Sequence, residues 1–142
     1  MAFERVFTVW DYYDGPRSGL ALFLGEPYHY QCEESEDGYC DAFFLAPINS
    51  KTFSLAMEQW TIWRAWEAAF HRGEVPASTH PALSGSNQRY AELQAALDTQ
   101  LSQQPAHRRK ARAAFRAQEG QEETPPGVLR EMEVEWSDQP TG

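Results

Sequence analysis

The sequence has few basic residues and few cysteines, and it lacks a long apolar run. Its 142 residues include 12 Lys and Arg against 21 Asp and Glu, which is a formal net charge of −9. Because phosphate groups are bound by positively charged surfaces, this balance argues against nucleic acid as the main partner. No run of about 18 apolar residues is present, so we expect no membrane span.

The only two cysteines are Cys32 and Cys40, too few for a disulfide-rich scaffold. The first residues, Met-Ala-Phe-Glu-Arg, contain neither a basic stretch nor an apolar run, so the sequence predicts no signal peptide. A reduced, cytoplasmic location is therefore expected. A chain of this length can bury enough surface to fold without a metal ion or a disulfide, and we expect no metal and no cofactor.

Aromatic residues are present in number but are unevenly distributed. The chain holds 5 Trp, 6 Tyr and 8 Phe, and all but Tyr90, Phe115 and Trp136 lie between Phe3 and Phe70. The hydrophobic fraction of 42% argues against disorder. This distribution predicts that the first half builds the main core and that the second half docks onto it.

The pattern of residues predicts an α+β fold. We expect an antiparallel sheet of about four or five strands, with a Trp-rich helix packed on it and two further helices docked alongside. The expected strands are about 3–10, 19–24, 28–34, 39–46 and 128–136, and the expected helices are about 51–72 (Trp-rich), 86–103 and 105–118.

The same pattern predicts a single domain over residues 1–118, a linker over 119–127, and a C-terminal strand and tail over 128–142. Strict alternation in the last segment predicts one apolar and one acidic face. The segment either completes the sheet or reaches a partner or a second protomer. The apolar face holds Met132, Val134 and Trp136, and the acidic face holds Glu131, Glu133 and Glu135.

Asp37-Gly38 is the strongest hairpin signal in the chain. A two-residue loop there places Cys32 opposite Phe43 and puts Cys40 on the other face of the sheet. This geometry disfavours a Cys32–Cys40 disulfide, although a change of one residue in the loop would reverse the inference. The set His29, Cys32, Cys40 and Asp41 has no ligand spacing typical of zinc, so a metal site is not expected.

The stretch from Asp11 to Gly19 has two possible interpretations. Asp11, Asp14 and Arg17 follow a predicted strand, where binding sites often lie. A carboxylate could act as a general base and Arg17 could bind an anion. His29 and the neighbouring Tyr12 and Tyr13 would line the pocket or act as acid–base groups. Alternatively, the stretch is a structured turn in which Arg17 pairs with a nearby Asp.

Trp60, Trp63 and Trp66 lie at three-residue spacing on the expected helix 51–72. These tryptophans are core residues if other parts of the chain cover the helix. Since apolar residues surround much of this helix, we also consider an exposed Trp surface that binds a partner, a second copy or an apolar ligand.

The segment 105–118 is basic and would place Arg108, Arg112 and Arg116 on one helical stripe. Such a stripe can bind nucleic acid or anionic lipid, but the acidic remainder of the chain would repel a polyanion. The stripe is also explained if its arginines face solvent or pair with acidic residues of the same chain.

The preferred hypothesis is a non-enzymatic protein-interaction module, such as an inhibitor, immunity-type factor or adaptor. It would bind a protein partner or form a homodimer through two groups of residues. These are the tryptophans Trp60, Trp63 and Trp66 and the acids Glu131, Glu133 and Glu135. The alternative is a small enzyme or ligand-binding domain whose pocket is formed by Asp11, Asp14, Arg17 and His29.

Overall fold

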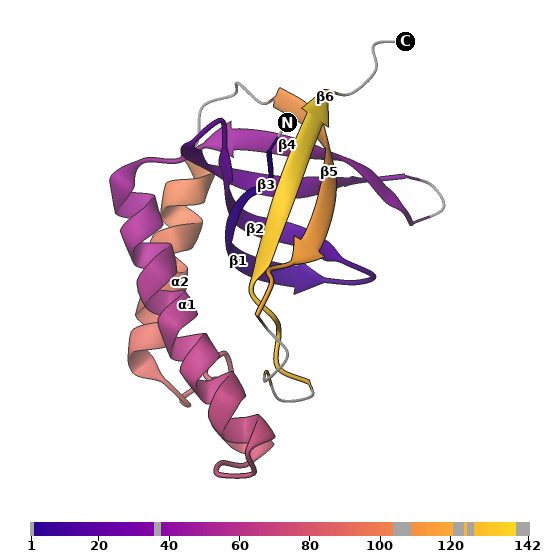
Figure 1. Cartoon of the computed structure of the whole chain (residues 1–142). Helices are drawn as coiled ribbons and strands as arrows, with labels where there is room; N and C mark the ends of the chain where they lie inside the picture. Colours follow the sequence, from indigo (N-terminus) through magenta and orange to yellow (C-terminus); the bar gives the residue numbers. More distant parts are fainter. Residues whose placement is uncertain (1, 36–37, 104–108, 121–123, 125–126, 139–142) are drawn as a thin grey trace. The chain divides into compact units, whose positions relative to one another are not determined.

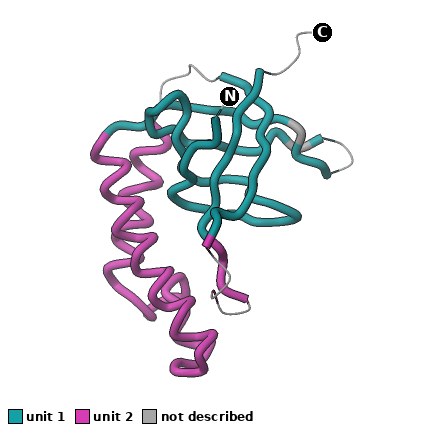
Figure 2. Tube along the Cα trace, viewed as in Figure 1, with its two compact units in different colours: residues 1–49, 104–119, 131–142 teal, residues 50–103, 120–130 magenta. Residues whose placement is uncertain are grey.

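The computed structural model describes residues 2–35, 38–103, 109–120, 124 and 127–138 (Figure 1). The chain divides into two compact units, which are described separately (Figure 2). Unit 1 comprises residues 1–49, 104–119 and 131–142, and unit 2 comprises residues 50–103 and 120–130.

Unit 1 is a closed barrel of antiparallel strands in sequence order, so the expected open sheet is wrong. The barrel closes because the last strand pairs with both its predecessor and the first strand, as in Glu4 opposite Val134. Closure leaves no unpaired sheet edge. The strands are β1 (Glu4–Tyr12), β2 (Pro16–Phe23), β3 (Glu26–Glu34), β4 (Cys40–Pro47), β5 (Arg109–Ala117) and β6 (Met132–Asp138).

The expected helix over 105–118 is also wrong, because its described part forms β5. Alanine and arginine favour helices by intrinsic propensity, but tertiary pairing overrides this weak preference. Strand β5 pairs with β4 on one side and with β6 on the other. Residues 105–108 lie outside the described residues, so only Arg112 and Arg116 of the proposed basic stripe can be placed.

The barrel interior is filled by an aromatic cluster from four strands. We call it the internal cluster: Tyr30, Phe43, Phe115 and Trp136. Its ring centroids lie 5.5–6.1 Å apart, in tilted or edge-on arrangements. Such geometry is favourable for aromatic pairs. Phe115 and Trp136 come from the second half of the chain, so the first half does not build this core alone.

Buried polar groups inside the barrel are paired. The Tyr30 hydroxyl donates to the Thr8 carbonyl at 2.9 Å, and the Trp136 indole N–H donates to the Leu22 carbonyl at 2.8 Å. Gly19 permits this close packing, because a Cβ there would lie 2.1 Å from the Thr8 carbonyl oxygen. Its φ of +153° adds strain for any other residue.

A β-bulge in the β3–β4 hairpin overturns the inference about the cysteines. Cys32 pairs with Phe43 as predicted, but Glu33 faces Ala42 while Glu34 faces Cys40, so β4 contains one extra residue. The extra residue moves Cys40 onto the face of Cys32. The two form a disulfide with Cα atoms 5.6 Å apart. Because disulfides persist mainly in oxidising compartments, this bond counts against the expected reduced cytoplasmic location.

Unit 2 contains the two expected helices, α1 (Ser50–His71) and α2 (Gln88–Ser102), with the short 3-10 helix η1 (Ala77–Thr79) between them. Asn87 caps α2 by accepting a hydrogen bond from the Tyr90 N–H at 2.8 Å. The helices are joined by the ion pair between Glu58 and Arg89. No helix in the described part of the chain is long and apolar enough to cross a membrane.

Candidate functional site

Two hairpin turns of the barrel, β1–β2 and β3–β4, lie at the same end of it. Three of the predicted site residues, Asp11, Asp14 and Arg17, lie in or next to the β1–β2 turn. Asp14 lies in the β1–β2 turn with a φ of 55°, and its side chain is exposed. Asp11 is exposed at the end of β1, opposite Ser18. Arg17, in contrast, is only 9% exposed. An arginine this deeply buried needs hydrogen-bond partners, because burying an unpaired charge is unfavourable.

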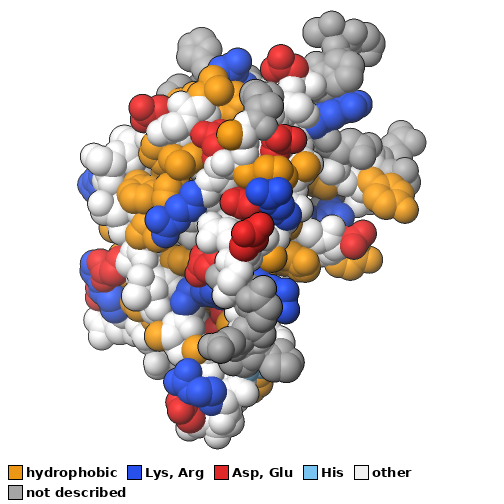
Figure 3. All heavy atoms as spheres, viewed as in Figure 1, with side chains coloured by type: hydrophobic (Ala, Val, Ile, Leu, Met, Phe, Trp, Pro, Cys, Tyr) orange, Lys and Arg blue, Asp and Glu red, His pale blue; other side chains and the backbone are white. Residues whose placement is uncertain are grey.

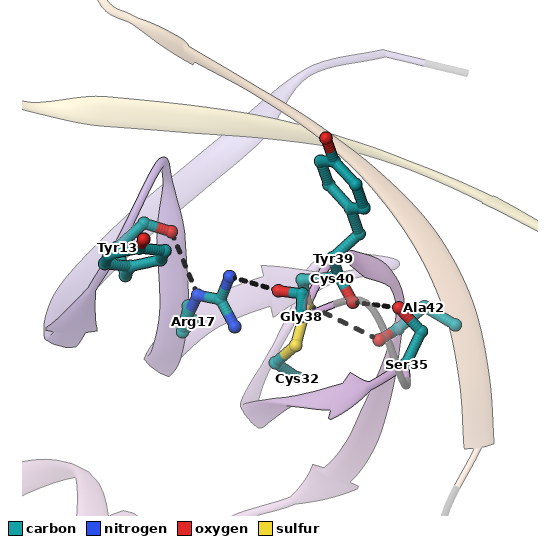
Figure 4. Close-up of a disulfide and its surroundings, with 8 residues drawn as sticks. All are labelled: Tyr13, Arg17, Cys32, Ser35, Gly38, Tyr39, Cys40 and Ala42. Atoms are coloured by element: carbon teal, nitrogen blue, oxygen red, sulfur yellow. Dashed lines mark hydrogen bonds between the residues drawn. A yellow bond between two sulfur atoms is a disulfide. The ribbon is translucent and has the colours of Figure 1, made fainter.

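Arg17 joins the two hairpins. Its Nε donates to the Tyr13 carbonyl at 2.9 Å, and its Nη2 donates to the Gly38 carbonyl at 2.7 Å. The guanidinium carbon also lies 5.1 Å from the centre of the Tyr13 ring. Figure 4 shows Arg17 between the two turns. Both hydrogen bonds are made to backbone carbonyls, one in each turn.

The tip of the β3–β4 hairpin is held by further bonds. The backbone N–H and the hydroxyl of Ser35 both donate to the Tyr39 carbonyl, at 3.1 and 2.9 Å. The Gly38 N–H donates to the Ser35 carbonyl at 2.9 Å. The Cys32–Cys40 disulfide lies at the base of this tip (Figure 4). Ser35, Gly38 and Tyr39 are therefore linked to one another, and Gly38 also to Arg17.

Three large tyrosines project from these two turns, and we call this surface the hairpin face: Tyr12, Tyr13 and Tyr39. Their exposed fractions are 57%, 73% and 62%. Figure 4 shows the Tyr39 ring directed away from Arg17 and the disulfide. The predicted pocket included Tyr12 and Tyr13 as wall or acid–base candidates, and no role was predicted for Tyr39. Its position directly after the Asp37-Gly38 turn signal could have revealed an exposed residue.

A shallow groove of about 460 Å³ runs along the barrel beside the hairpin face. Asp11, Ser18 and Gln31 form one row across β1, β2 and β3, because each is the Cα partner of the next. The structure thus brings Asp11 and Arg17 into one lining. The complete lining is Asp11, Arg17, Ser18, Gln31, Cys32, Glu33 and Phe44.

His29 and Asp14 are not part of this lining. The His29 ring instead lies 5.6 Å from the Trp10 ring. Within the described residues, no group of three His, Cys, Asp or Glu side chains could hold a metal ion.

The three tryptophans of α1 have partners within unit 2. Trp60 and Trp63 stack with ring centroids 5.1 Å apart. Trp66 stacks on Phe70 at 4.9 Å, and its indole N–H donates to the Thr79 hydroxyl at 2.9 Å. All three side chains are half-buried. They are thus partly engaged by their own unit.

A buried carboxylate on α1 anchors the segment that follows β5. Glu67, only 4% exposed, accepts a hydrogen bond from the Leu129 N–H at 2.9 Å and pairs with Arg64 at 2.6 Å. Arg64 in turn donates to the Leu129 carbonyl. Nothing in the sequence marks Glu67, because a single acidic residue on a helix forms no pattern.

The predicted acidic face of β6 lies beside the basic strand β5. Arg116 is the Cα partner of Glu133 and forms an ion pair with it. Glu131, Glu133 and Glu135 are all half-buried. In the face drawn in Figure 3, acidic and basic side chains are interspersed over these strands. Two stretches that the sequence presented as separate charged surfaces thus partly neutralise each other.

No protein-family model, curated protein or solved structure matches this chain.

Proposed function

We propose that this protein is a non-enzymatic interaction module that binds a basic partner protein through its hairpin face. The observation that carries the proposal is the exposure of Tyr12, Tyr13 and Tyr39 on two turns that Arg17 holds together. Tyrosine offers a large, rigid contact area with a polar tip and loses little conformational entropy on binding. Turns that are ordered before binding lose less entropy still.

Charge supports a basic partner. Residues 1–49 carry nine acidic and two basic residues, a net charge of −7. Such a surface attracts a positively charged protein and accelerates encounter. A second copy of this chain would bring the same negative charges together, so self-association through the hairpin face is disfavoured.

The first experiment selects peptides from a random display library on the immobilised full-length chain. We expect the recovered peptides to be enriched in Lys and Arg and to bind less tightly as salt increases. The triple variant Tyr12→Ser/Tyr13→Ser/Tyr39→Ser should weaken binding about tenfold or more, which corresponds to about 1.4 kcal/mol.

The matched control is Leu24→Asn. Leu24 is 64% exposed in the β2–β3 turn, and its φ of 52° suits asparagine. This turn lies at the opposite end of the up-and-down barrel from the hairpin face. The control should bind like wild type. Peptides without basic residues, or equal binding by the triple variant, would refute the proposal.

Trp60, Trp63, Trp66, Glu131, Glu133 and Glu135 remain candidates for a second contact region. Trp63→Ala or charge reversal of the three glutamates should then weaken binding without unfolding the chain. Unchanged affinity in both would leave the hairpin face as the only proposed contact region.

A second candidate function is a small ligand-binding domain or enzyme, and the groove that joins Asp11 and Arg17 supports it. Its test is a thermal-shift screen of small molecules against wild type and Asp11→Asn. Hits that stabilise both equally would count against it.

A further inference from the structure

We propose that the groove beside the hairpin face is a subsite for a lysine side chain. This inference rests on the proposed function, because it names the group through which a basic partner would be recognised. The relevant part of the groove is the row Asp11, Ser18 and Gln31, with Glu33 and Phe44 beside it.

The shape of the row follows from strand register. Ser18 on β2 is the Cα partner of Asp11 on β1 and of Gln31 on β3. Residues opposite each other in antiparallel strands project from the same face, and neighbouring strands lie about 4.8 Å apart. A small serine between two longer side chains leaves a trough about two strand spacings wide. An extended alkyl chain fits such a trough.

The polar groups of this row are available. Within the described part of the chain, the side chains of Asp11, Ser18 and Gln31 form no hydrogen bond or ion pair. Their carboxylate, hydroxyl and amide oxygens supply three acceptors from three strands. An ammonium group has three N–H donors and no acceptor, so the two sets match in number.

The chain already binds one of its own lysines at the far end of the same row. Phe44 is the Cα partner of Gln31 and of Lys110. The Lys110 Nζ lies 3.1 Å from a Glu33 oxygen and 5.1 Å from the centre of the Phe44 ring. This carboxylate–aromatic pair shows the chemistry that an incoming ammonium would meet in the groove.

Two positive charges line or border the groove, and both are engaged. Arg17 donates to the Tyr13 and Gly38 carbonyls, and Lys110 pairs with Glu33. The Asp11 carboxylate is left without a described ion-pair partner, within a segment of net charge −7 over residues 1–49. The surrounding field therefore favours a cation over an anion.

The test is an NMR titration of the ¹⁵N-labelled full-length chain with Nα-acetyl-lysine methylamide. We expect saturable shifts confined to the amides around Asp11, Ser18 and Gln31. The matched probe, acetylated on Nε as well, has nearly the same shape without the charge and should produce no such shifts. The Asp11→Asn variant should bind lysine about three- to fivefold more weakly, the range of an exposed ion pair.

The control variant is Asp14→Asn. It removes one negative charge three residues away, from an exposed turn position that lies outside the groove lining. Its φ of 55° suits asparagine. Binding by Asp14→Asn should equal that of wild type. Absent or dispersed shifts, equal shifts with the Nε-acetylated probe, or equal losses in both variants would overturn the subsite.

The same variants separate this inference from the proposed function. Selected peptides that depend on the three tyrosines but not on Asp11 would overturn the subsite and leave the proposed function standing. The opposite result is lysine binding that depends on Asp11, together with peptide binding that does not change in the tyrosine variant. It would refute binding through the hairpin face and leave the subsite standing.

Discussion

The barrel contains two groups of aromatic residues in opposite environments. The rings of the internal cluster pack against one another, and Tyr30 is 0% exposed. The hairpin face projects its tyrosines into solvent, with Tyr13 73% exposed. Both groups contain the same residue type, so residue identity alone does not distinguish a core tyrosine from a surface one.

The difference comes from strand direction and turn position. Tyr30 lies in mid-strand and faces the interior, where its hydroxyl reaches the Thr8 carbonyl. Tyr13 and Tyr39 lie between strands, where the backbone leaves the sheet, and both side chains are mostly exposed. Burial makes the first group essential for stability, whereas the exposed second group contributes little to it.

The largest expected effect is that of Trp136→Ala. This change removes a side chain that is 2% exposed and contacts three other rings of the internal cluster. We expect a loss of about 3–5 kcal/mol in the free energy of unfolding, measured by urea denaturation. The matched change Tyr39→Ala should shift it by less than about 0.5 kcal/mol. Similar losses in the two variants would contradict the comparison.

The second largest effect concerns the disulfide that supports the hairpin face. Cys32→Ala/Cys40→Ala removes a link between residues separated by 8 positions. By the loop-entropy estimate this lowers the free energy of unfolding by about 2–3 kcal/mol. A reductant should destabilise wild type by a similar amount and leave the double variant unchanged. An equal response of both proteins to reductant would argue against the bond.

Tyr30→Phe should have a smaller effect that depends on pH. Loss of the hydrogen bond to Thr8 should lower the free energy of unfolding by about 1–2 kcal/mol at neutral pH. Burial raises the pKa of Tyr30 well above its ordinary value of 10.0. The unfolded chain therefore loses this proton first, and the contribution present below pH 10 is lost as the pH rises further.

The measurement is urea denaturation of wild type and Tyr30→Phe at about pH 8 and about pH 11. The stability advantage of wild type over the variant should shrink at the higher pH. A constant difference between the two proteins would show that Tyr30 does not contribute to alkaline unfolding.

The smallest effect on stability is expected for Tyr12→Ser/Tyr13→Ser. Both side chains are more than half exposed, so the free energy of unfolding should change by less than about 0.5 kcal/mol per residue. Thermal unfolding followed by circular dichroism tests this. A drop of several kcal/mol would mean that the hairpin face is structural, and binding losses in these variants could not then be assigned to contact.

Local patterns predicted most of the individual elements. β-Branched and aromatic runs located β1 to β4, and strict alternation located β6 with Val134 and Trp136 on its buried face. The Asp37-Gly38 signal predicted the register of Cys32 opposite Phe43. These features can be predicted because each depends on the pattern of residues that are close together in the sequence.

Other features depend on pairings between distant residues. Strand β5 has a helix-favouring composition and becomes a strand only because β4 and β6 lie on either side of it. The bulge that unites Cys32 and Cys40 is one extra residue, which no local pattern marks. For the candidate site, the structure places Asp11, Arg17 and Ser18 of the Asp11–Gly19 stretch in one groove lining, but no local pattern marks Arg17 as a link between hairpins.

The sequence by itself determined the acidic balance of the chain, the periodicity of most of its strands and helices, and the polar stretch that contains Asp11, Asp14 and Arg17. Only the tertiary structure decided that the sheet closes into a barrel and that the charges of β5 and β6 partly neutralise each other. It also decided that Ser18 separates Asp11 from Gln31 to form a groove. The physical reason is that periodicity is a property of successive residues, whereas closure, charge pairing and grooves arise from register between strands far apart in the chain.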